Sequence, residues 1–274
     1  MNGQLQRILL ANIEFTDISP KTNSGTLETL ICLHGIGGND ASFLPQSIAL
    51  SDQFRIIAWN MPGYAGSQSL EMQTFETLSE SLHNLLQSLN VGPVHLVGQS
   101  IGGMIAQEFA HRHSELVKSL VLIATTSAFG GRDESFKQAF LQARLKPLDE
   151  GKSMAELATE TVPIITGSKV TETVSNAAIK SMSAVPINTY RQILKCLITF
   201  NRREEFANIQ CPVCLIAGSE DTNAPAITMK KMSDKLPDSE YHELQGGGHL
   251  VNIEMSDHSN RIICQFINKY FSDD

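Results

Sequence analysis

Hydrophobic positions along this chain follow two alternating patterns. Short apolar runs, typical of strands buried on both faces of a parallel sheet, occur near residues 29–33, 54–59, 94–98, 119–124 and 213–217, and a further strand is expected near 240–244. Between several runs, hydrophobic residues recur every three or four positions, as in an amphipathic helix, and most clearly over residues 75–89. Residues 8–18 are expected to form leading antiparallel strands. The alternation predicts an α/β fold with a mainly parallel central sheet and helices on both faces.

The pattern changes between residues 128 and 206, where successive stretches have hydrophobic residues every three or four positions and no strand pattern lies between them. Four helices are predicted in this segment, over residues 134–144, 154–161, 171–182 and 188–200. Residues that commonly end or begin helices punctuate it: Pro147, Pro163, Gly167 and Pro186. We therefore expect a core domain, residues 1–127 and 207–274, into which a helical cap, residues 128–206, is inserted.

Composition is that of an ordinary globular protein. The chain has 274 residues, of which 42% are hydrophobic and 18% are charged, which is enough for a core domain and an insertion. Its 21 basic and 29 acidic residues give a net charge of -8, which argues against nucleic-acid and anionic-membrane partners. No apolar run reaches the roughly 18 residues of a membrane span, and residues 1–7 do not begin a secretion leader. These features predict a cytoplasmic protein whose partner is a small molecule.

The five cysteines do not indicate a disulfide framework or a metal site. Their number is odd, and the pair Cys211 and Cys214 lies at the start of a buried run without a second pair. Neither a zinc site nor a thiol redox site is supported. We expect no metal and no cofactor.

The strongest candidate for chemistry is the stretch Gly98-Gln99-Ser100-Ile101-Gly102, which follows an apolar run and opens onto a helical segment. Glycines on both sides of the serine permit a tight turn that lifts the hydroxyl clear of the backbone. Ser100 is therefore the candidate nucleophile. A helix that begins with a capping serine after a glycine turn would have the same pattern, so the motif needs support from other segments.

A second segment, His34-Gly35-Ile36-Gly37-Gly38, follows the run at 29–33 and supplies backbone amides. Fixed amides can stabilise the negative charge that builds on a carbonyl oxygen during acyl transfer. The Ile36 and Ile101 amides are the candidate donors, with Gly37 as an alternative to Ile36. Ile101 directly follows the nucleophile, at the positive end of a helix. A glycine turn without chemistry is the other interpretation of this loop.

Two further segments supply an acid and a base. The run at 213–217 ends in Glu220 and Asp221, and either carboxylate could orient a histidine. His249 follows three glycines just before the last helical pattern and is the candidate general base. The order serine, acid, histidine is that of hydrolases with a strand-to-helix nucleophile turn. Among the other histidines, His34 is expected to shape its loop, and His113 is expected to be solvated.

These motifs together resemble the α/β-hydrolase family across essentially the whole chain, and most resemble its small capped esterases and enol-lactonases. In that family the acid commonly stands three residues after a glycine, as Asp221 follows Gly218, so the resemblance favours Asp221 over Glu220. The turn from Asn60 to Ser67 is similar to the family pattern Asp-x-Pro-Gly-x-Gly-x-Ser. Asn60 replaces the aspartate and Ala65 a glycine, which affects the expected hydrogen bonding of that loop.

The resemblance implies a serine hydrolase that cleaves a carboxylic ester or lactone through an acyl-enzyme, without a cofactor. Ser100, His249 and Asp221 would form its triad, and the cap would shape the substrate pocket. Relatives that hydrolyse carbon–carbon bonds of ring-cleavage products are one alternative, although they usually carry asparagine where Gln99 stands. A small-molecule receptor that retains the triad without turnover is another. Relatives that act on haloalkanes or epoxides use aspartate in place of Ser100.

Overall fold

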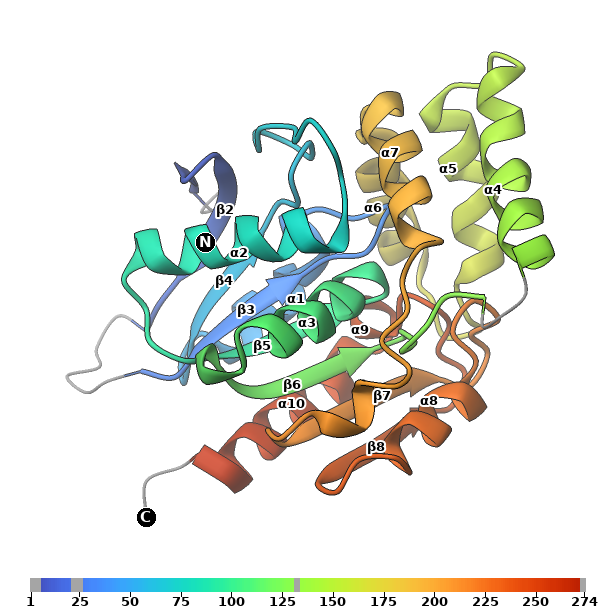
Figure 1. The fold of residues 1–274 in the computed structure, drawn as a ribbon. Helices are drawn as coiled ribbons and strands as arrows, with labels where there is room; N and C mark the ends of the chain where they lie inside the picture. Colours follow the sequence, from blue (N-terminus) through green and yellow to red (C-terminus); the bar gives the residue numbers. More distant parts are fainter. Residues whose placement is uncertain (1–5, 21–26, 131–133, 272–274) are drawn as a thin grey trace.

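The computed structural model describes residues 6–20, 27–130 and 134–271 and contains one eight-stranded sheet (Figure 1). The strand order is β1-β2-β4-β3-β5-β6-β7-β8. β1 and β2 pair antiparallel, β2 and β4 also pair antiparallel, and the other pairs are parallel. The strands are β1 Arg7–Leu10, β2 Ile13–Ile18, β3 Thr29–Leu33, β4 Arg55–Trp59, β5 Val94–Gln99, β6 Val117–Ile123, β7 Val213–Gly218 and β8 Ser239–Leu244. The mainly parallel sheet and the leading antiparallel strands are confirmed.

Helices cover both faces of the sheet, as the apolar runs predict. Alternate residues of β3 enter different cores: Ile31 and Leu33 join one hydrophobic cluster, and Leu30 and Cys32 join another. The first cluster lies under α2 (Phe75–Leu89), α3 (Ile101–Arg112) and α8 (Ala226–Ser233). The second lies under α1 (Leu44–Leu50), α9 (Val251–Glu254) and α10 (Ser256–Phe271). Burial on both faces explains why the central strands β3 to β7 have mostly hydrophobic sequences, whereas the outer strands β1, β2 and β8 do not.

Four helices occupy the segment between β6 and β7 and stand together at one side of the molecule (Figure 1). They are α4 (Glu134–Asp149), α5 (Met154–Ile165), α6 (Glu172–Ser183) and α7 (Ile187–Leu197). Backbone hydrogen bonds join the residues just before α4 to those just after α7. The Phe129 amide donates to the Phe200 carbonyl at 2.9 Å, and the Arg202 amide donates to the Ser127 carbonyl at 2.8 Å.

Two of the predicted helix ends are wrong. α4 continues through Pro147, and α5 continues through Pro163. Each proline lies in the last turn of its helix, where its missing N–H removes one bond and little helix remains to be disrupted. Gly167 lies between α5 and α6, and Pro186 directly precedes α7, as predicted.

None of the helices in the described ranges is both long and apolar enough to cross a membrane. The expectation about a secretion leader concerns residues 1–7, of which residues 1–5 lie outside the described residues.

Candidate active site

Ser100 lies in the turn between β5 and α3, in a backbone conformation that non-glycine residues rarely adopt. Its φ is 55° and its ψ is -121°. The flanking glycines permit this turn because the backbone passes so close to them. A Cβ atom on Gly98 would lie 2.6 Å from Gly103 Cα, and one on Gly102 would collide with the Leu33 carbonyl. Such strain persists only where the surrounding structure holds it, which makes the turn a candidate functional feature.

Three side chains from separate loops form a hydrogen-bonded chain that ends at the Ser100 hydroxyl. His249 Nε2 lies 3.0 Å from Ser100 Oγ, and His249 Nδ1 lies 2.8 Å from Asp221 Oδ2. The Asp221 side chain is fully buried, and that of His249 is 12% exposed. This arrangement leaves Nδ1 to donate to the carboxylate and Nε2 to accept from the hydroxyl.

The Asp221 carboxylate is fixed by backbone donors as well as by the imidazole. Asp221 Oδ1 accepts from the amides of Asn223 at 2.8 Å and Ala224 at 3.0 Å. Burial raises the pKa of Asp221, but the charge of His249 and these hydrogen bonds outweigh burial, so the pKa of Asp221 lies below its usual value. Asp221 is therefore ionised at neutral pH and can stabilise a protonated His249.

Glu220 points elsewhere. Its carboxylate accepts from the Ser168 amide at 2.7 Å and from the Ser168 hydroxyl at 2.8 Å. Ser168 belongs to the loop between α5 and α6, so Glu220 connects that loop to the end of β7. Of the two adjacent carboxylates, it is Asp221 that contacts His249.

The two candidate oxyanion donors come from different segments: Ile36 from the loop after β3, and Ile101 from the start of α3 next to Ser100. Ile101 is the first residue of α3, so its amide has no acceptor within the helix. Ile36 follows β3 and lines the same cavity as Ser100 and His249. The loop of Ile36 is held in place because the Tyr64 hydroxyl donates to the Ile36 carbonyl at 2.8 Å.

His34 shapes this loop in the way the sequence predicts. Its ring is fully buried, Nδ1 lies 2.8 Å from the Gly35 carbonyl, and Nε2 accepts from the Met61 amide at 3.0 Å. Burial lowers the pKa of His34 to about 4, so the ring is neutral and Nδ1 is the donor. Asn60 also has defined partners, because its Oδ1 accepts from the Asp40 amide at 2.8 Å.

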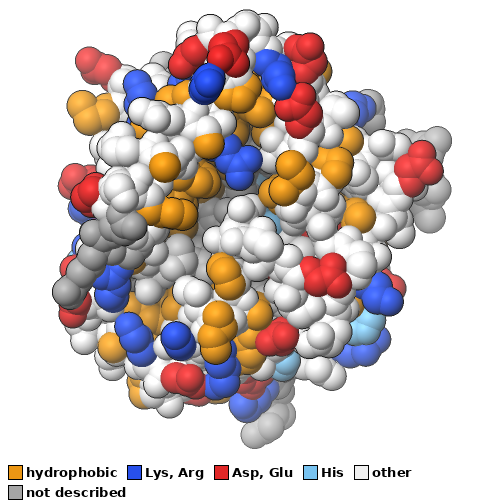
Figure 2. All heavy atoms as spheres, turned by 90° about the vertical axis from the view of Figure 1, so that its right-hand side faces the viewer, with side chains coloured by type: hydrophobic (Ala, Val, Ile, Leu, Met, Phe, Trp, Pro, Cys, Tyr) orange, Lys and Arg blue, Asp and Glu red, His pale blue; other side chains and the backbone are white. Residues whose placement is uncertain are grey.

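A cavity of about 1130 Å³ opens above Ser100 and His249, and α4, α5, α6 and α7 contribute to its walls. Figure 2 shows this side of the molecule hollowed between groups of hydrophobic side chains. The lining is mostly apolar and includes Phe140, Met182 and Leu194. A largely apolar cavity with a few polar groups at one end is typical of a small-molecule site.

Comparison with known proteins agrees with this arrangement. A family model described as the alpha/beta hydrolase fold matches residues 28–255. The chain belongs to the α/β-hydrolase family. Membership supports hydrolase activity in general terms, and the eight-stranded sheet is the fold expected of the family.

Individual relatives of this α/β hydrolase carry different names. Poly(3-hydroxyalkanoate) depolymerase from Ectopseudomonas oleovorans is 28% identical over 247 residues, which cover 89% of this chain and 85% of that protein. The enol-lactonase from Burkholderia xenovorans LB400 superposes with a TM-score of 0.84 at 20% identity, covering 96% of this chain and 100% of that one. Bromoperoxidase from Bacillus anthracis superposes with a TM-score of 0.81 at 18% identity, covering 93% of this chain and 95% of that one. The two structures share the fold, and their names do not fix the reaction of this chain.

Glu254, which was not predicted from the sequence, supports the loop of His249 in this α/β hydrolase. The buried carboxylate of Glu254 accepts from the Gly248 amide at 2.9 Å and the Leu250 amide at 2.9 Å, on either side of His249. It also accepts from the Gly167 amide of the α5–α6 loop at 2.7 Å. Burial raises the pKa of Glu254, although the three amide donors oppose the rise. A run of glycine amides that needs an acceptor, followed closely by a glutamate, is the signal that could have identified it.

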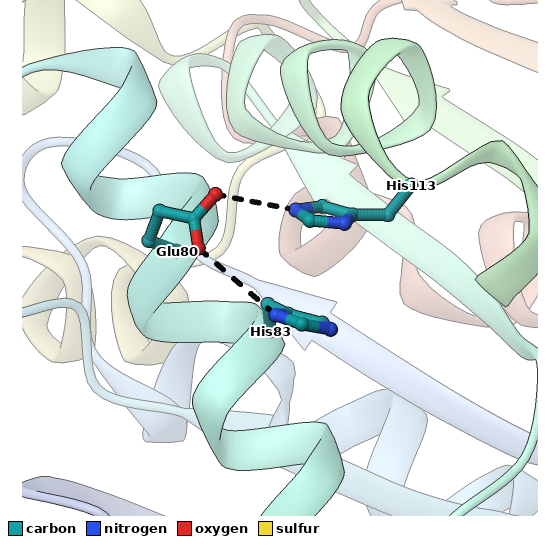
Figure 3. A group of neighbouring side chains, drawn as sticks. All are labelled: Glu80, His83 and His113. Atoms are coloured by element: carbon teal, nitrogen blue, oxygen red, sulfur yellow. Dashed lines mark ion pairs between the residues drawn. The ribbon is translucent and has the colours of Figure 1, made fainter.

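A group that could coordinate a metal lies at the opposite end of α3 from Ser100. Glu80 and His83 come from α2, and His113 directly follows α3 (Figure 3). One Glu80 oxygen lies 3.4 Å from His113 Nε2, and the other lies 4.0 Å from His83 Nδ1. The two rings are stacked, with centroids 4.3 Å apart and planes 12° from parallel.

The lone pair of an imidazole nitrogen lies in the plane of its ring, so two stacked rings cannot both direct a lone pair at one ion. The arrangement therefore fits a carboxylate that bridges two rings better than three ligands around a metal. The expectation that His113 is solvated is wrong, since its side chain is 15% exposed and its ring packs on His83 and Phe109.

Proposed function

We propose that this α/β hydrolase is a serine hydrolase that cleaves a carboxylic ester or a lactone through an acyl-enzyme. The observation that carries the proposal is the hydrogen-bonded chain from Asp221 through His249 to Ser100, which opens into the cavity. Nucleophile, base and orienting carboxylate are each within hydrogen-bond distance of the next, as this chemistry requires.

In the first half of the proposed reaction, Ser100 Oγ attacks the carbonyl carbon and its proton moves to His249 Nε2. The carbonyl oxygen becomes an oxyanion that the amides of Ile36 and Ile101 receive. The bond between the carbonyl carbon and the alcohol oxygen then breaks, and the alcohol leaves with the proton from His249. For a lactone, the alcohol remains attached to the acyl chain.

In the second half, water attacks the acyl-enzyme while His249 takes one of its protons. The bond to Ser100 Oγ breaks, His249 returns the proton to Oγ, and the carboxylic acid is released. Asp221 holds the imidazole tautomer and stabilises the imidazolium in both halves. No step requires a metal or an organic cofactor.

We propose that residues 128–206 act as the cap domain of this enzyme and select its substrates. α6 supplies Met182, which lies over the oxyanion loop: a Cβ atom on Gly37 would be 3.3 Å from Met182 Cγ. α7 and α4 add further apolar walls. The partner of the protein is thus a small molecule that enters between cap and core.

The proposal is tested by covalent labelling together with turnover. A fluorophosphonate should form a bond between its phosphorus and Ser100 Oγ with loss of fluoride, and mass spectrometry should locate the label on the Ser100 peptide. Nitrophenyl butyrate should be turned over many times per protein molecule. Release of about one nitrophenol per site without further turnover would favour the receptor, and preference for a ring-cleavage dienone would favour carbon–carbon bond hydrolysis.

A further inference from the structure

The charged residues that line the cavity differ in sign from those of the whole chain. The protein has 29 acidic and 21 basic residues. Among the described residues that line the cavity, the charged side chains are Arg7, Arg144 and Lys180, and none is an aspartate or glutamate. Figure 2 shows a basic side chain between the hydrophobic groups that border the hollow. A cavity with this lining attracts anions, although the protein as a whole repels them.

Arg144 is the cation best placed to bind a ligand. Arg7 is already engaged, because its guanidinium lies 2.7 Å from the Asp40 carboxylate. Lys180 is exposed. Arg144 is half-buried on α4 with its guanidinium 5.3 Å from the centre of the Phe140 ring, and within the described ranges it makes no hydrogen bond or ion pair. A guanidinium next to apolar walls, with no ion-pair partner among the described residues, can bind an anion.

Tyr190 adds a second donor to the same wall. It lies on α7, which packs against α4, and its side chain lines the cavity although the residue is 2% exposed. No described group forms a hydrogen bond with its hydroxyl. Burial raises the pKa of Tyr190, and the charge of nearby Arg144 opposes the rise, so the phenol stays protonated and can donate.

We infer that Arg144 and Tyr190 bind a carboxylate on the acyl part of the substrate, so that the enzyme prefers esters or lactones carrying a negative charge remote from the scissile bond. This inference rests on the proposed function, because it assigns a substrate class to the same cavity. The guanidinium and the phenol match the two oxygens of a carboxylate. The apolar walls between this pair and Ser100 hold the connecting methylene groups.

The test compares nitrophenyl hemiesters of adipic and suberic acids with uncharged nitrophenyl esters of equal chain length. The rate with Ser100→Ala protein is subtracted from each measurement as background. Wild-type enzyme should favour the charged esters in kcat/KM, and this preference should fall about 10- to 100-fold in Arg144→Gln, as expected for a hydrogen bond to a charged group. Arg144→Lys should restore part of it, and Tyr190→Phe should lower it less.

Lys146→Gln is the matched control, since Lys146 lies on the same helix but is exposed and 3.7 Å from Glu150. It should keep the full preference. High salt should reduce the preference of the wild type, because it screens the charge of the ligand. Hydrolysis of uncharged esters without any preference, or a preference that Arg144→Gln leaves intact, would overturn the inference while the proposed function stands.

Binding without turnover separates the two proposals further. Adipate should bind Ser100→Ala protein in calorimetry, and Ser100→Ala/Arg144→Gln should bind it at least about 10-fold more weakly. Butyl phosphate measured in parallel distinguishes a carboxylate site from a phosphate site, and tighter binding of the phosphate would contradict the carboxylate assignment. If no ester is hydrolysed but adipate binding still depends on Arg144, the proposed function fails and the anion site stands.

Discussion

The loops that hold Ser100, His249 and Asp221 differ from the helices α4 to α7 in how their polar side chains are bonded. In the loops, buried carboxylates accept several hydrogen bonds: Asp221 and Glu254 each accept three. In the cap wall, side chains are mostly apolar, and Arg144 and Tyr190 have no bonded partner among the described residues. Reacting groups must be fixed within about 0.5 Å, whereas a pocket can discriminate through many small, exchangeable contacts. In the proposed function the loops perform the chemistry and the cap helices select the substrate, and this contrast supports that division.

Among the predicted substitutions, replacement of Ser100, the proposed nucleophile, should have the largest effect. Ser100→Ala should lower kcat for nitrophenyl butyrate by about 10⁴-fold or more, and adding His249→Ala should cost scarcely more, since the two groups act as a unit. Steady-state kinetics and thermal melting of both variants measure this, with Tm expected to stay close to wild type. Residual activity above about a tenth, or losses that add, would contradict the assigned pair.

Asp221→Asn should reduce kcat by about 10⁴-fold, because the amide stabilises the wrong imidazole tautomer. Glu220→Gln is the control, since Glu220 is bonded to Ser168 and not to His249. Its kcat should be close to that of the wild type. The reverse ranking of the two variants would move the acid to Glu220.

The free energy of unfolding should depend on pH because His34 is buried in the loop after β3. The neutral ring is required in the fold, where burial holds its pKa at about 4 instead of 6.5. The folded state therefore binds fewer protons than the unfolded state between these values, so stability is complete above about pH 6.5 and falls as the pH drops toward 4. A shift of this size corresponds to about 3 kcal/mol.

Urea unfolding at several pH values tests the His34 prediction. His34→Gln should be less stable at neutral pH but should lose less on acidification than the wild type does. His95 is the second buried histidine, and burial also lowers its pKa to about 4, so part of the acid sensitivity should remain in the variant. Equal pH dependence in the two proteins would refute the role of His34.

Glu254→Gln should have a smaller effect that distinguishes positioning from general stability. The amide can accept from Gly167 and Gly248 or from Leu250, but not from all three, so the loop of His249 loses part of its support. We expect kcat to fall about 10- to 100-fold with KM nearly unchanged. The rate of fluorophosphonate labelling should fall in parallel. Glu160→Gln, an exposed carboxylate paired with Lys152, is the control. A lower Tm with unchanged kcat would make Glu254 purely structural.

Sequence patterns predicted those parts of the molecule that depend on local chemistry. Apolar runs predicted the central strands β3 to β7 because these strands are buried on both faces of the sheet. Glycines predicted the turn at Ser100 because only they permit its close backbone approach. Ser100, Asp221 and His249 each follow such a run or turn, and the structure brings all three together. The bounds of α4 and α5 were less predictable, since a proline in a last turn does not end a helix.

Contacts between distant segments could not be predicted. Glu254 meets Gly167 of the cap across 87 positions, and no local pattern links them. Hydrophobic cap residues look alike in sequence whether they face a neighbouring helix or the cavity: Phe140 and Met182 line it, and Leu157 does not. Which side of a helix faces the cavity depends on how all four helices pack together. The position of Arg144 in the cavity lining therefore could not be predicted from the sequence near it.

The smallest effect is expected from a substitution in the cap helices, which tests whether they select the substrate. Met182 is buried on α6 above the oxyanion loop, so Met182→Ala should enlarge the acyl end of the cavity without disturbing the hydrogen bonds at Ser100. Since a methylene in an apolar pocket is worth about 1 to 3 kcal/mol, the kcat/KM ratio of nitrophenyl octanoate to butyrate should rise about 10-fold. The labelling rate with a small fluorophosphonate should remain close to that of the wild type. Ile164→Ala is the control, because this side chain of α5 is 75% exposed and does not line the cavity. An unchanged ratio in Met182→Ala would mean that the core loops select the acyl chain, and the division of labour between loops and cap would then be wrong.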